Sequence, residues 1–350
     1  MKLLDKQNKK IKILVTGGGG FIGGAVIRKL LKENNCTIFN LDKMGYASDI
    51  SLIEETIQHL GEKHFNRHKL FKTDLINQSE VNSTIYLANP DYVIHLAAES
   101  HVDRSLVEPR SFIESNIVGT LNLLEAAKIY WEKLPNNKKN KFKFHHVSTD
   151  EVYGSLGKTG KFDENTKYSP RSPYSASKAS SDHLVSSWFY SFSLPVLITN
   201  CSNNYGPFQH HEKLIPSSIQ KALNGDQIPL YGDGNNIRDW IYIEDHIDAL
   251  LLVADKGNIG NQYCIGSNNE RKNISVLLQI CRLMDIYSPK NYPHEKLIKY
   301  VTDRPGHDRR YAIDSNKIKS ELGWEPKHSF KKGLERTVQW YIKNQSLWKK

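Results

Sequence analysis

A run of glycines placed directly after a short apolar segment constrains the fold of this chain more than any other feature. Residues 11–16 read IKILVT, which is typical of a buried strand, and residues 17–23 read GGGGFIG before apolar residues at helical spacing. Gly17 would form the tight turn, Gly20 would let a pyrophosphate approach the backbone, and Gly23 would let the helix pack closely against the sheet. The motif therefore predicts a dinucleotide bound at the N-terminus of the first helix.

Acidic residues end the next two predicted strands. Asp42 follows the apolar run Cys36–Leu41 and lies 19 residues after Gly23. A carboxylate there can accept both ribose hydroxyls of NAD and would repel the 2′-phosphate of NADP. We therefore expect NAD as the cofactor, although the neighbouring Lys43 leaves NADP open. Asp74 ends the third strand, where it would either hydrogen-bond the adenine amine or cap the turn.

Short apolar segments alternate with helical ones through residues 11–201, and the pattern loosens beyond about residue 203. Such alternation predicts an α/β fold, a Rossmann-type doubly wound parallel sheet with a smaller mixed α/β C-terminal substrate domain. We expect residues 1–202 to form the NAD-binding domain and residues 203–350 mainly the substrate-binding domain, with some chain crossing back. Strands are expected at residues 11–16, 36–41, 69–72, 92–97, 142–148, 196–201, 228–231 and 262–265, and helices at 21–32, 51–60, 79–87, 112–131, 174–192, 245–254, 274–284 and 330–343.

The composition narrows the class of protein. A length of 350 residues with 39% apolar residues excludes a disulfide-stapled miniprotein and a fibrous repeat. The four cysteines form no CxxC pair and the histidines no metal-binding motif, so we expect no metal and a reducing compartment. No apolar run approaches the roughly 20 residues of a membrane helix, and the first ten residues lack a signal core. A net charge of +10 alone admits several anionic partners, but we expect a cytoplasmic protein without membrane or nucleic-acid contacts.

Two sequence patterns carry candidate catalytic groups. Tyr174 and Lys178 are four residues apart, hence on one face of a helix, where the ammonium group would lower the phenol pKa from about 10 toward neutrality. A tyrosine so tuned can act as a general base at a substrate hydroxyl, and the lysine could also hold the nicotinamide ribose.

The second pattern is Ser148-Thr149-Asp150-Glu151, which follows the fifth predicted strand. Ligands of parallel sheets bind outside the carboxyl ends of the strands, so these polar groups should face the crevice. A bend at the end of the strand could aim both carboxylates at one ligand. Two carboxylates held together push their pKa values apart, which leaves one group protonated as an acid and the other ionised as a base.

Taken together, these motifs are similar to those of a known family. The glycine motif, LAAESHVDRS at 96–105, STDEVYG at 148–154, PYSASKASSDHL at 173–184, RDWIYIEDH and DRPGHDRRYAID closely resemble the nucleotide-sugar 4,6-dehydratases of the extended short-chain dehydrogenase/reductase family. The resemblance runs from about Lys12 to beyond Trp324. Related epimerases usually lack the acidic pair and related decarboxylases tend to keep only the glutamate, so Thr-Asp-Glu is the discriminating feature.

The resemblance implies a hydro-lyase that converts dTDP-glucose or UDP-glucose to the 4-keto-6-deoxy sugar nucleotide, in deoxysugar biosynthesis of the rhamnose type. Tyr174 would take the proton of the 4-hydroxyl, aligned by Thr149. Glu151 would take the C5 proton, while protonated Asp150 donates to the departing 6-hydroxyl. The resemblance also suggests a homodimer formed through the helices at 112–131 and 174–192.

The implied contacts form two sets. Those to NAD are Gly17, Gly20, Phe21, Ile22, Gly23, Asp42, Lys43, Asp74, Leu75, Ala97, Tyr174 and Lys178, and those to the sugar nucleotide are Ser100, His101, Thr149, Asn203, Arg238, Asn269 and Arg304. Two alternatives stay open at this point. One is an epimerase or decarboxylase on the same scaffold, and the other is a non-catalytic NAD-binding or RNA-binding regulator.

Overall fold

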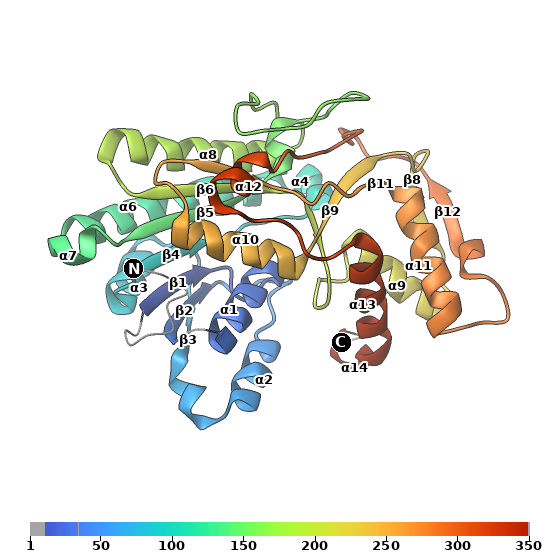
Figure 1. Ribbon diagram of the computed structural model, residues 1–350, viewed down its shortest axis with the longest axis horizontal. Helices are drawn as coiled ribbons and strands as arrows, with labels where there is room; N and C mark the ends of the chain where they lie inside the picture. Colours follow the sequence, from blue (N-terminus) through green and yellow to red (C-terminus); the bar gives the residue numbers. More distant parts are fainter. Residues whose placement is uncertain (1–10, 34, 349–350) are drawn as a thin grey trace.

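The computed structural model describes residues 11–33 and 35–348 and is built around a seven-stranded parallel sheet (Figure 1). The strand order is β10-β6-β5-β4-β1-β2-β3. The chain runs from β1 through β2 to β3 at one edge, then returns to β4 on the other side of β1 and continues to β5 and β6. This confirms the predicted doubly wound α/β fold. The first ten residues, in which we expect no signal core, lie outside the described residues. The strands of this sheet are β1 (Ile11–Thr16), β2 (Cys36–Asp42), β3 (His68–Lys72), β4 (Tyr92–His95), β5 (Lys143–Thr149), β6 (Val196–Cys201) and β10 (Gln262–Ile265).

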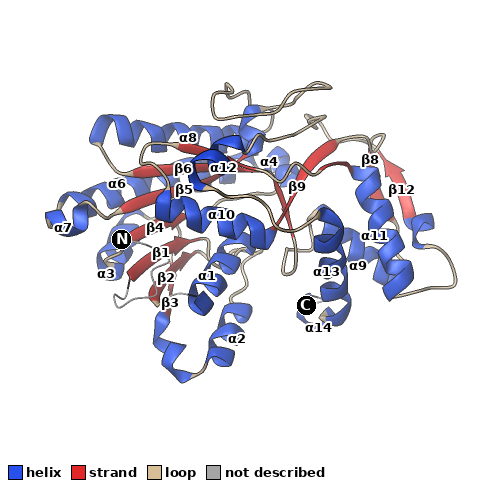
Figure 2. Cartoon of the chain, in the orientation of Figure 1, coloured by secondary structure: helices blue, strands red, loops and turns tan. Residues whose placement is uncertain are grey.

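Helices cover both faces of the sheet, which explains why its strands read as nearly continuous apolar runs (Figure 2). Ile13 and Val15 of β1 belong to one apolar core, and Leu14 between them belongs to the other. The first core packs against α1 (Phe21–Glu33), α2 (Ser51–Leu60) and α10 (Ile243–Lys256), and the second against α3 (Gln78–Ala88), α6 (Gly119–Glu132) and α8 (Pro173–Phe192).

The helix predicted over 112–131 is present as an unbroken helical run, but it contains a π-helical turn that the sequence did not predict. The chain forms α5 (Pro109–Phe112), a π-helical turn η2 (Ile113–Val118) and then α6. Within the turn, the carbonyl of Asn116 accepts hydrogen bonds from Thr120 Oγ1 at 2.5 Å and Ser181 Oγ at 2.7 Å. The Asn116 side chain donates to Ser177 Oγ at 2.8 Å. Polar contacts with α8 thus accompany the widened turn, and helical periodicity alone does not reveal them.

A second group of elements lies beside the sheet, at the right of Figure 1. Tyr205, Trp240 and Phe330 pack within its own apolar core. The chain then crosses back, because α10 packs on α1 and β10 pairs with β6 in the main sheet. The strands of the second group are β7 (Asn203–Tyr205), β8 (Ile228–Tyr231), β9 (Ile237–Tyr242), β11 (Glu270–Lys272) and β12 (Ile298–Val301), and its helices are α9 (Leu214–Asn224), α11 (Asn273–Tyr287) and α13 (Phe330–Lys343).

The remaining elements are short and connect or flank these two groups. The division at residues 202 and 203 stays a prediction. In the described part of the chain, no helix combines the length and apolar character needed to cross a membrane. The short elements are η1 (Glu62–Arg67), α4 (Val102–Val107), α7 (Asn136–Lys139), η3 (Asp150–Tyr153), η4 (His294–Leu297), α12 (Asn316–Leu322) and α14 (Gln345–Trp348).

Candidate active site

The carboxyl ends of β1, β2, β4, β5 and β6 border a cavity of about 660 Å³. This is the edge of a parallel sheet at which ligands bind. Every residue expected to contact NAD lies on the wall of this cavity, as do Thr149, Asp150, Glu151, Ser100 and Asn203. The fold thus brings the glycine motif and both candidate catalytic patterns to one site.

The glycine motif forms a cradle that side chains would obstruct. Gly17 has a φ of 72°, and a Cβ there would lie 2.7 Å from the backbone nitrogen of Ala97. A Cβ on Gly23 would lie 2.1 Å from the carbonyl oxygen of Gly17. At Gly20 the nearest atom to such a Cβ would be the same oxygen, at 3.3 Å, so its outer side is open. The cradle fits a pyrophosphate at the start of α1.

Asp42 is fixed at the end of β2, beside this cradle. Its carboxylate accepts hydrogen bonds from Gly19 N at 2.8 Å, Met44 N at 2.7 Å and Ser48 Oγ at 2.9 Å. Lys43, the residue that left NADP open, makes an ion pair with Glu99 at 2.6 Å. The Asp42 carboxylate at the ribose position would repel the 2′-phosphate of NADP, and Lys43 is already paired with Glu99, so both residues favour NAD over NADP. The residues of the cavity therefore fit NAD.

The acid pair is positioned by the end of β5. Thr149 is the N-cap of η3, because its Oγ1 accepts a hydrogen bond from the backbone nitrogen of Glu151 at 3.3 Å. The strand therefore stops and the following turn carries Asp150 and Glu151 to the same cavity wall. The bend inferred from the sequence is present.

The start of α8 sets the position of Tyr174. Ser172 and Ser175 form a capping box, and Pro173 occupies the first turn. These local signals begin the helix directly before Tyr174. Its phenol therefore enters the cavity one helical turn before Lys178.

Burial separates the roles of the two carboxyl groups. Asp150 is only 1% exposed, and its pKa is raised well above 3.8 by burial and then by the neighbouring charge of Glu151. Burial also raises the pKa of Glu151, but the positive charges of Arg238, Arg304 and Lys213 oppose that effect. The arrangement suits a protonated Asp150 beside an ionisable Glu151.

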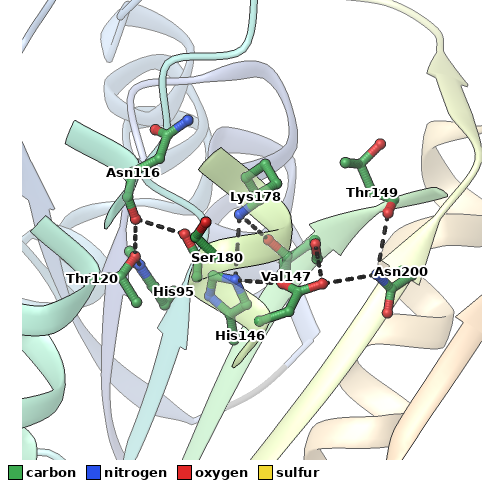
Figure 3. Close-up of polar contacts among 12 residues, drawn as sticks. His95, Asn116, Thr120, His146, Val147, Thr149, Lys178, Ser180 and Asn200 are labelled. Atoms are coloured by element: carbon green, nitrogen blue, oxygen red, sulfur yellow. Dashed lines mark hydrogen bonds and ion pairs between the residues drawn. The ribbon is translucent and has the colours of Figure 1, made fainter. Parts of the chain in front are cut away.

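The prediction that Lys178 lowers the pKa of Tyr174 toward neutrality is wrong for this structure. Burial raises the pKa of Tyr174 well above 10, the charges of Glu151 and Cys201 add to this, and a hydrogen bond with Thr149 opposes it. The ammonium group of Lys178 is engaged elsewhere. Its Nζ donates to the carbonyl of Val147 at 3.0 Å (Figure 3). Helical spacing placed both side chains at the site but could not predict these contacts.

The expected sugar-nucleotide contacts are not all gathered at the cavity wall. Ser100 and Asn203 line it, whereas His101, Arg238, Asn269 and Arg304 lie beyond it. Arg238 stacks 4.2 Å over the ring of Tyr311 and donates to the carbonyl of Asp308 at 3.0 Å. Arg304 pairs with Asp103 at 2.7 Å, His101 caps α4, and the backbone nitrogen of Asn269 donates to Asp239.

Lys213 and Tyr311 belong to the site although sequence reasoning did not single them out. The Lys213 ammonium donates to the carbonyl of Ser100 at 3.0 Å and its charge reaches Glu151. The Tyr311 hydroxyl donates to Asp308 Oδ2 at 2.6 Å. Tyr311 stands in the DRPGHDRRYAID stretch, which was a usable signal, but no pattern marks Lys213.

Comparison with known proteins shows the family to which this chain belongs. The family model described as GDP-mannose 4,6 dehydratase matches residues 14–337. The dTDP-glucose 4,6-dehydratase of Salmonella typhimurium is 50% identical over 343 residues, covering 95% of this chain and 93% of the relative.

Two solved structures share the fold and most of the chain. A dTDP-glucose 4,6-dehydratase of Bacillus anthracis, in complex with NAD, has a TM-score of 0.83 at 41% identity, and one of Streptomyces venezuelae, with NAD and TYD bound, has 0.85 at 37%. In both cases 97% of this chain and 99% of the other are covered.

Replacing Asp150 with Asn should stabilise the folded protein progressively as pH rises. The pKa of Asp150 is raised in the folded protein, so folded wild-type protein keeps a proton that the unfolded chain releases above about pH 4. The free energy of unfolding of the wild-type protein therefore falls as pH rises, until pH exceeds the raised pKa. The uncharged variant escapes this loss. Denaturant unfolding between about pH 5 and about pH 9 should show a growing advantage, up to about 1.4 kcal/mol for each unit by which the pKa is raised.

The matched control is Asp226→Asn, which removes an exposed carboxylate. This control should gain no such advantage, because a solvated carboxylate carries little desolvation cost. A stability difference between Asp150→Asn and wild type that stays constant across the pH series would contradict the assignment of Asp150 as a carboxyl group held protonated.

Proposed function

Because the chain belongs to the family described as GDP-mannose 4,6 dehydratase, we propose that it is an NAD-dependent hydro-lyase that converts dTDP-glucose to its 4-keto-6-deoxy derivative. The observation that carries this proposal is the pair Asp150 and Glu151 on the cavity wall beside Tyr174. A protonated and an ionisable carboxyl group side by side suit the elimination of water. The names of the relatives favour thymidine over uridine as the nucleoside.

The first step is oxidation at C4 of the glucose. Bound NAD would supply the hydride acceptor for C4 and, once reduced, the hydride donor for C6. Tyr174 Oη takes the proton of the 4-hydroxyl, and Thr149 aligns that hydroxyl. Tyr174 must lose its own proton before this step, and the cation available to stabilise its phenolate is Lys178, one helical turn further along α8.

The second step is loss of water across C5 and C6. The new 4-ketone acidifies C5, and Glu151 removes the C5 proton, helped by the positive charges of Arg238, Arg304 and Lys213. Asp150 donates its proton as the C6–O bond breaks, so the oxygen leaves as water. Glu151 then returns its proton to C5 as hydride reaches C6, which completes the 4-keto-6-deoxy sugar.

The acid pair also distinguishes this reaction from others on the same scaffold. An epimerase needs the C4 oxidation but has no leaving group to protonate, and so no use for a buried acid beside the base. A non-catalytic NAD-binding or RNA-binding regulator would have no use for the whole set of Thr149, Asp150, Glu151, Tyr174 and Lys178. Dehydration is the function that uses every member of this set.

We further propose that Asn203, Arg238, Asn269 and Arg304 contact the nucleoside diphosphate. The Asn203 side-chain oxygen is buried without a hydrogen-bond partner among the described residues, and Arg238 and Arg304 offer planar forks that suit a diphosphate. The ion pair between Arg304 and Asp103 would have to break before Arg304 could contact the diphosphate. The product would then enter deoxysugar synthesis of the rhamnose type.

A homodimer and a cytoplasmic location complete the proposal. Exposed apolar side chains gather on neighbouring helical elements, Ile113 and Val118 on η2, Ile129 on α6, and Tyr190 and Phe192 on α8. Two copies meeting through this face would form a four-helix contact. All four cysteines are free thiols, the state that a reducing cytoplasm maintains.

Purified protein loaded with NAD should convert dTDP-glucose to a 4-keto product, measured by its absorbance in alkali. Turnover in deuterium oxide should place deuterium at C5, because Glu151 removes and returns that proton. UDP-glucose in competition should be the poorer substrate, by about 10- to 200-fold, the range that one methyl-sized difference in a pocket allows. Absence of 4-keto product from both sugar nucleotides would refute the proposed function.

The double variant Asp150→Asn, Glu151→Gln should separate the two steps. Oxidation at C4 does not use these carboxyl groups, so the absorbance of the reduced cofactor should accumulate while release of 4-keto-6-deoxy product falls by at least about 100-fold. The control is Tyr174→Phe, which should block the first step and leave the cofactor oxidised. Full turnover by the double variant would contradict the acid–base roles of Asp150 and Glu151.

Tyr190→Glu should weaken self-association. Tyr190 is 80% exposed in the last turn of α8, within the proposed contact, and an unpaired charge there should raise the dimer dissociation constant by about 30-fold or more, measured by analytical ultracentrifugation. Tyr300→Glu, at a 60% exposed tyrosine of β12, is the matched control and should leave association unchanged. A monomeric wild-type protein, or equal effects of the two changes, would contradict the proposed interface.

A further inference from the structure

One face of α8 carries a third ionisable group that the proposed reaction does not use. Tyr174, Lys178 and Asp182 follow one another at intervals of four residues, so all three point from the same side of the helix. Asp182 is 1% exposed and Lys178 is 4% exposed. A carboxylate buried this deeply costs free energy unless it is paired and hydrogen-bonded, so its presence calls for an explanation.

Asp182 is held as an ionised carboxylate by groups from β5, β6 and the loop before α8. Its Oδ2 accepts hydrogen bonds from Ser148 Oγ at 2.8 Å, Tyr168 OH at 2.8 Å and Asn200 Nδ2 at 3.2 Å. Its Oδ1 lies 3.1 Å from His146 Nε2. Burial acts to raise the pKa of Asp182, but His146, Lys178 and Ser148 outweigh it and the pKa is lowered.

His146 lies between this carboxylate and the catalytic lysine. Its Nε2 is 3.1 Å from Asp182 Oδ1 and 3.4 Å from Lys178 Nζ, as the central part of Figure 3 shows for the lysine side. Its Nδ1 has no hydrogen-bond partner within residues 11–33 and 35–348. Burial lowers the pKa of His146 to about 4, so the ring is neutral. The neutral ring therefore lies between the carboxylate and the ammonium group without adding a charge of its own.

Asp182 is the anion that balances Lys178. The other titratable groups whose charges couple to this ammonium are His146 on β5, His95 on β4 and Cys201 on β6. Burial lowers the pKa of His95 well below 6.5 and raises that of Cys201 to about 12, so neither carries charge at neutral pH. Tyr174, on the same helix face, is likewise neutral because burial raises its pKa. Among the described residues that face Lys178, only Asp182 is therefore ionised.

We propose that Asp182 is a positioning residue, the buried counter-ion that acts across His146 to keep Lys178 charged and held at the Val147 carbonyl beside Tyr174. This inference rests on the proposed function for its catalytic meaning. The ion pair itself is a property of the folded chain. Without Asp182, the ammonium group would be a buried charge with no opposite charge to balance it.

The charge of Lys178 can be measured without substrate. In the NAD-loaded protein labelled with ¹³C at lysine Cε, the Lys178 resonance is the one that disappears in Lys178→Arg, and its titration by nuclear magnetic resonance reports the ammonium. In Asp182→Asn the midpoint should fall by about one pH unit or more, since loss of a nearby opposite charge favours the neutral amine. An unchanged midpoint would overturn the proposal.

Tyr168→Phe is the matched control. It removes a hydrogen bond to the same Asp182 oxygen while leaving the negative charge in place. Its Lys178 midpoint should stay within a few tenths of a unit of wild type. Equal shifts in Tyr168→Phe and Asp182→Asn would mean that packing around Asp182, and not its charge, governs Lys178, and would also overturn the proposal.

The pH profile of turnover with dTDP-glucose supplies the functional readout. The alkaline limb of kcat in Asp182→Asn should move to lower pH by about one unit, because Lys178 loses its proton earlier. If the alkaline limb of kcat in Asp182→Asn lies at the same pH as in the wild-type enzyme, the role of Asp182 is refuted. A wild-type enzyme that gives no product would refute the proposed function instead, and the resonance titration would still decide whether Asp182 balances Lys178.

A charge-neutral double variant covers the case in which Asp182→Asn does not fold. If the single change fails because it strands the charge of Lys178, then Lys178→Met, Asp182→Asn should recover a cooperative unfolding transition, followed by circular dichroism. If Lys178→Met folds but the double variant does not, Asp182 serves its hydrogen bonds to Ser148, Tyr168 and Asn200 alone, and the proposal fails.

Discussion

Burial of ionisable side chains at the carboxyl edge of the parallel sheet is the constraint on which the site depends. The sheet is buried on both faces, so the groups that follow β5 and begin α8 are surrounded by protein on most sides. In such surroundings an ionisable side chain either becomes neutral or needs an opposite charge. Asp150 and Tyr174 take the first course, and Asp182 with Lys178 takes the second.

Local sequence signals were sufficient for the parts of the fold that depend on neighbours along the chain. The strand at 11–16, the glycines after it and Asp42 at the end of β2 lie where their spacing predicted. The turn at Thr149 and the start of α8 at Pro173 also follow from capping residues within a few positions. Each of these features needs only the chain's own periodicity and termini, so each could be predicted without the structure.

Features that depend on contacts distant in sequence could not be predicted in this way. The π turn at 113–118 accompanies hydrogen bonds between Asn116 and α8, more than 60 residues later. The return of β10 to the edge of the main sheet depends on pairing with β6. The pKa of Tyr174 was wrongly predicted because burial raises it, and spacing does not show that the carbonyl of Val147 holds Lys178. Lys213 enters the site through a loop without any motif. Spacing indicates which groups share a helix face but not what they meet there.

The direction of each pKa shift distinguishes two kinds of buried group. Asp182 accepts three hydrogen bonds on one oxygen, its other oxygen lies 3.1 Å from His146 Nε2, and its pKa is below the ordinary value, so it stays ionised and supplies a fixed charge. Asp150 is equally buried, but its carboxyl group accepts a hydrogen bond from Thr149 Oγ1 at 3.4 Å in place of the three that Asp182 accepts, and its pKa is raised, so it can hold a proton and release it. A protein gains nothing in stability from leaving a buried carboxyl group so poorly compensated. The contrast between two aspartates at the same edge of the sheet therefore identifies Asp150 as the group whose proton moves, and Asp182 as the group that keeps its neighbour charged.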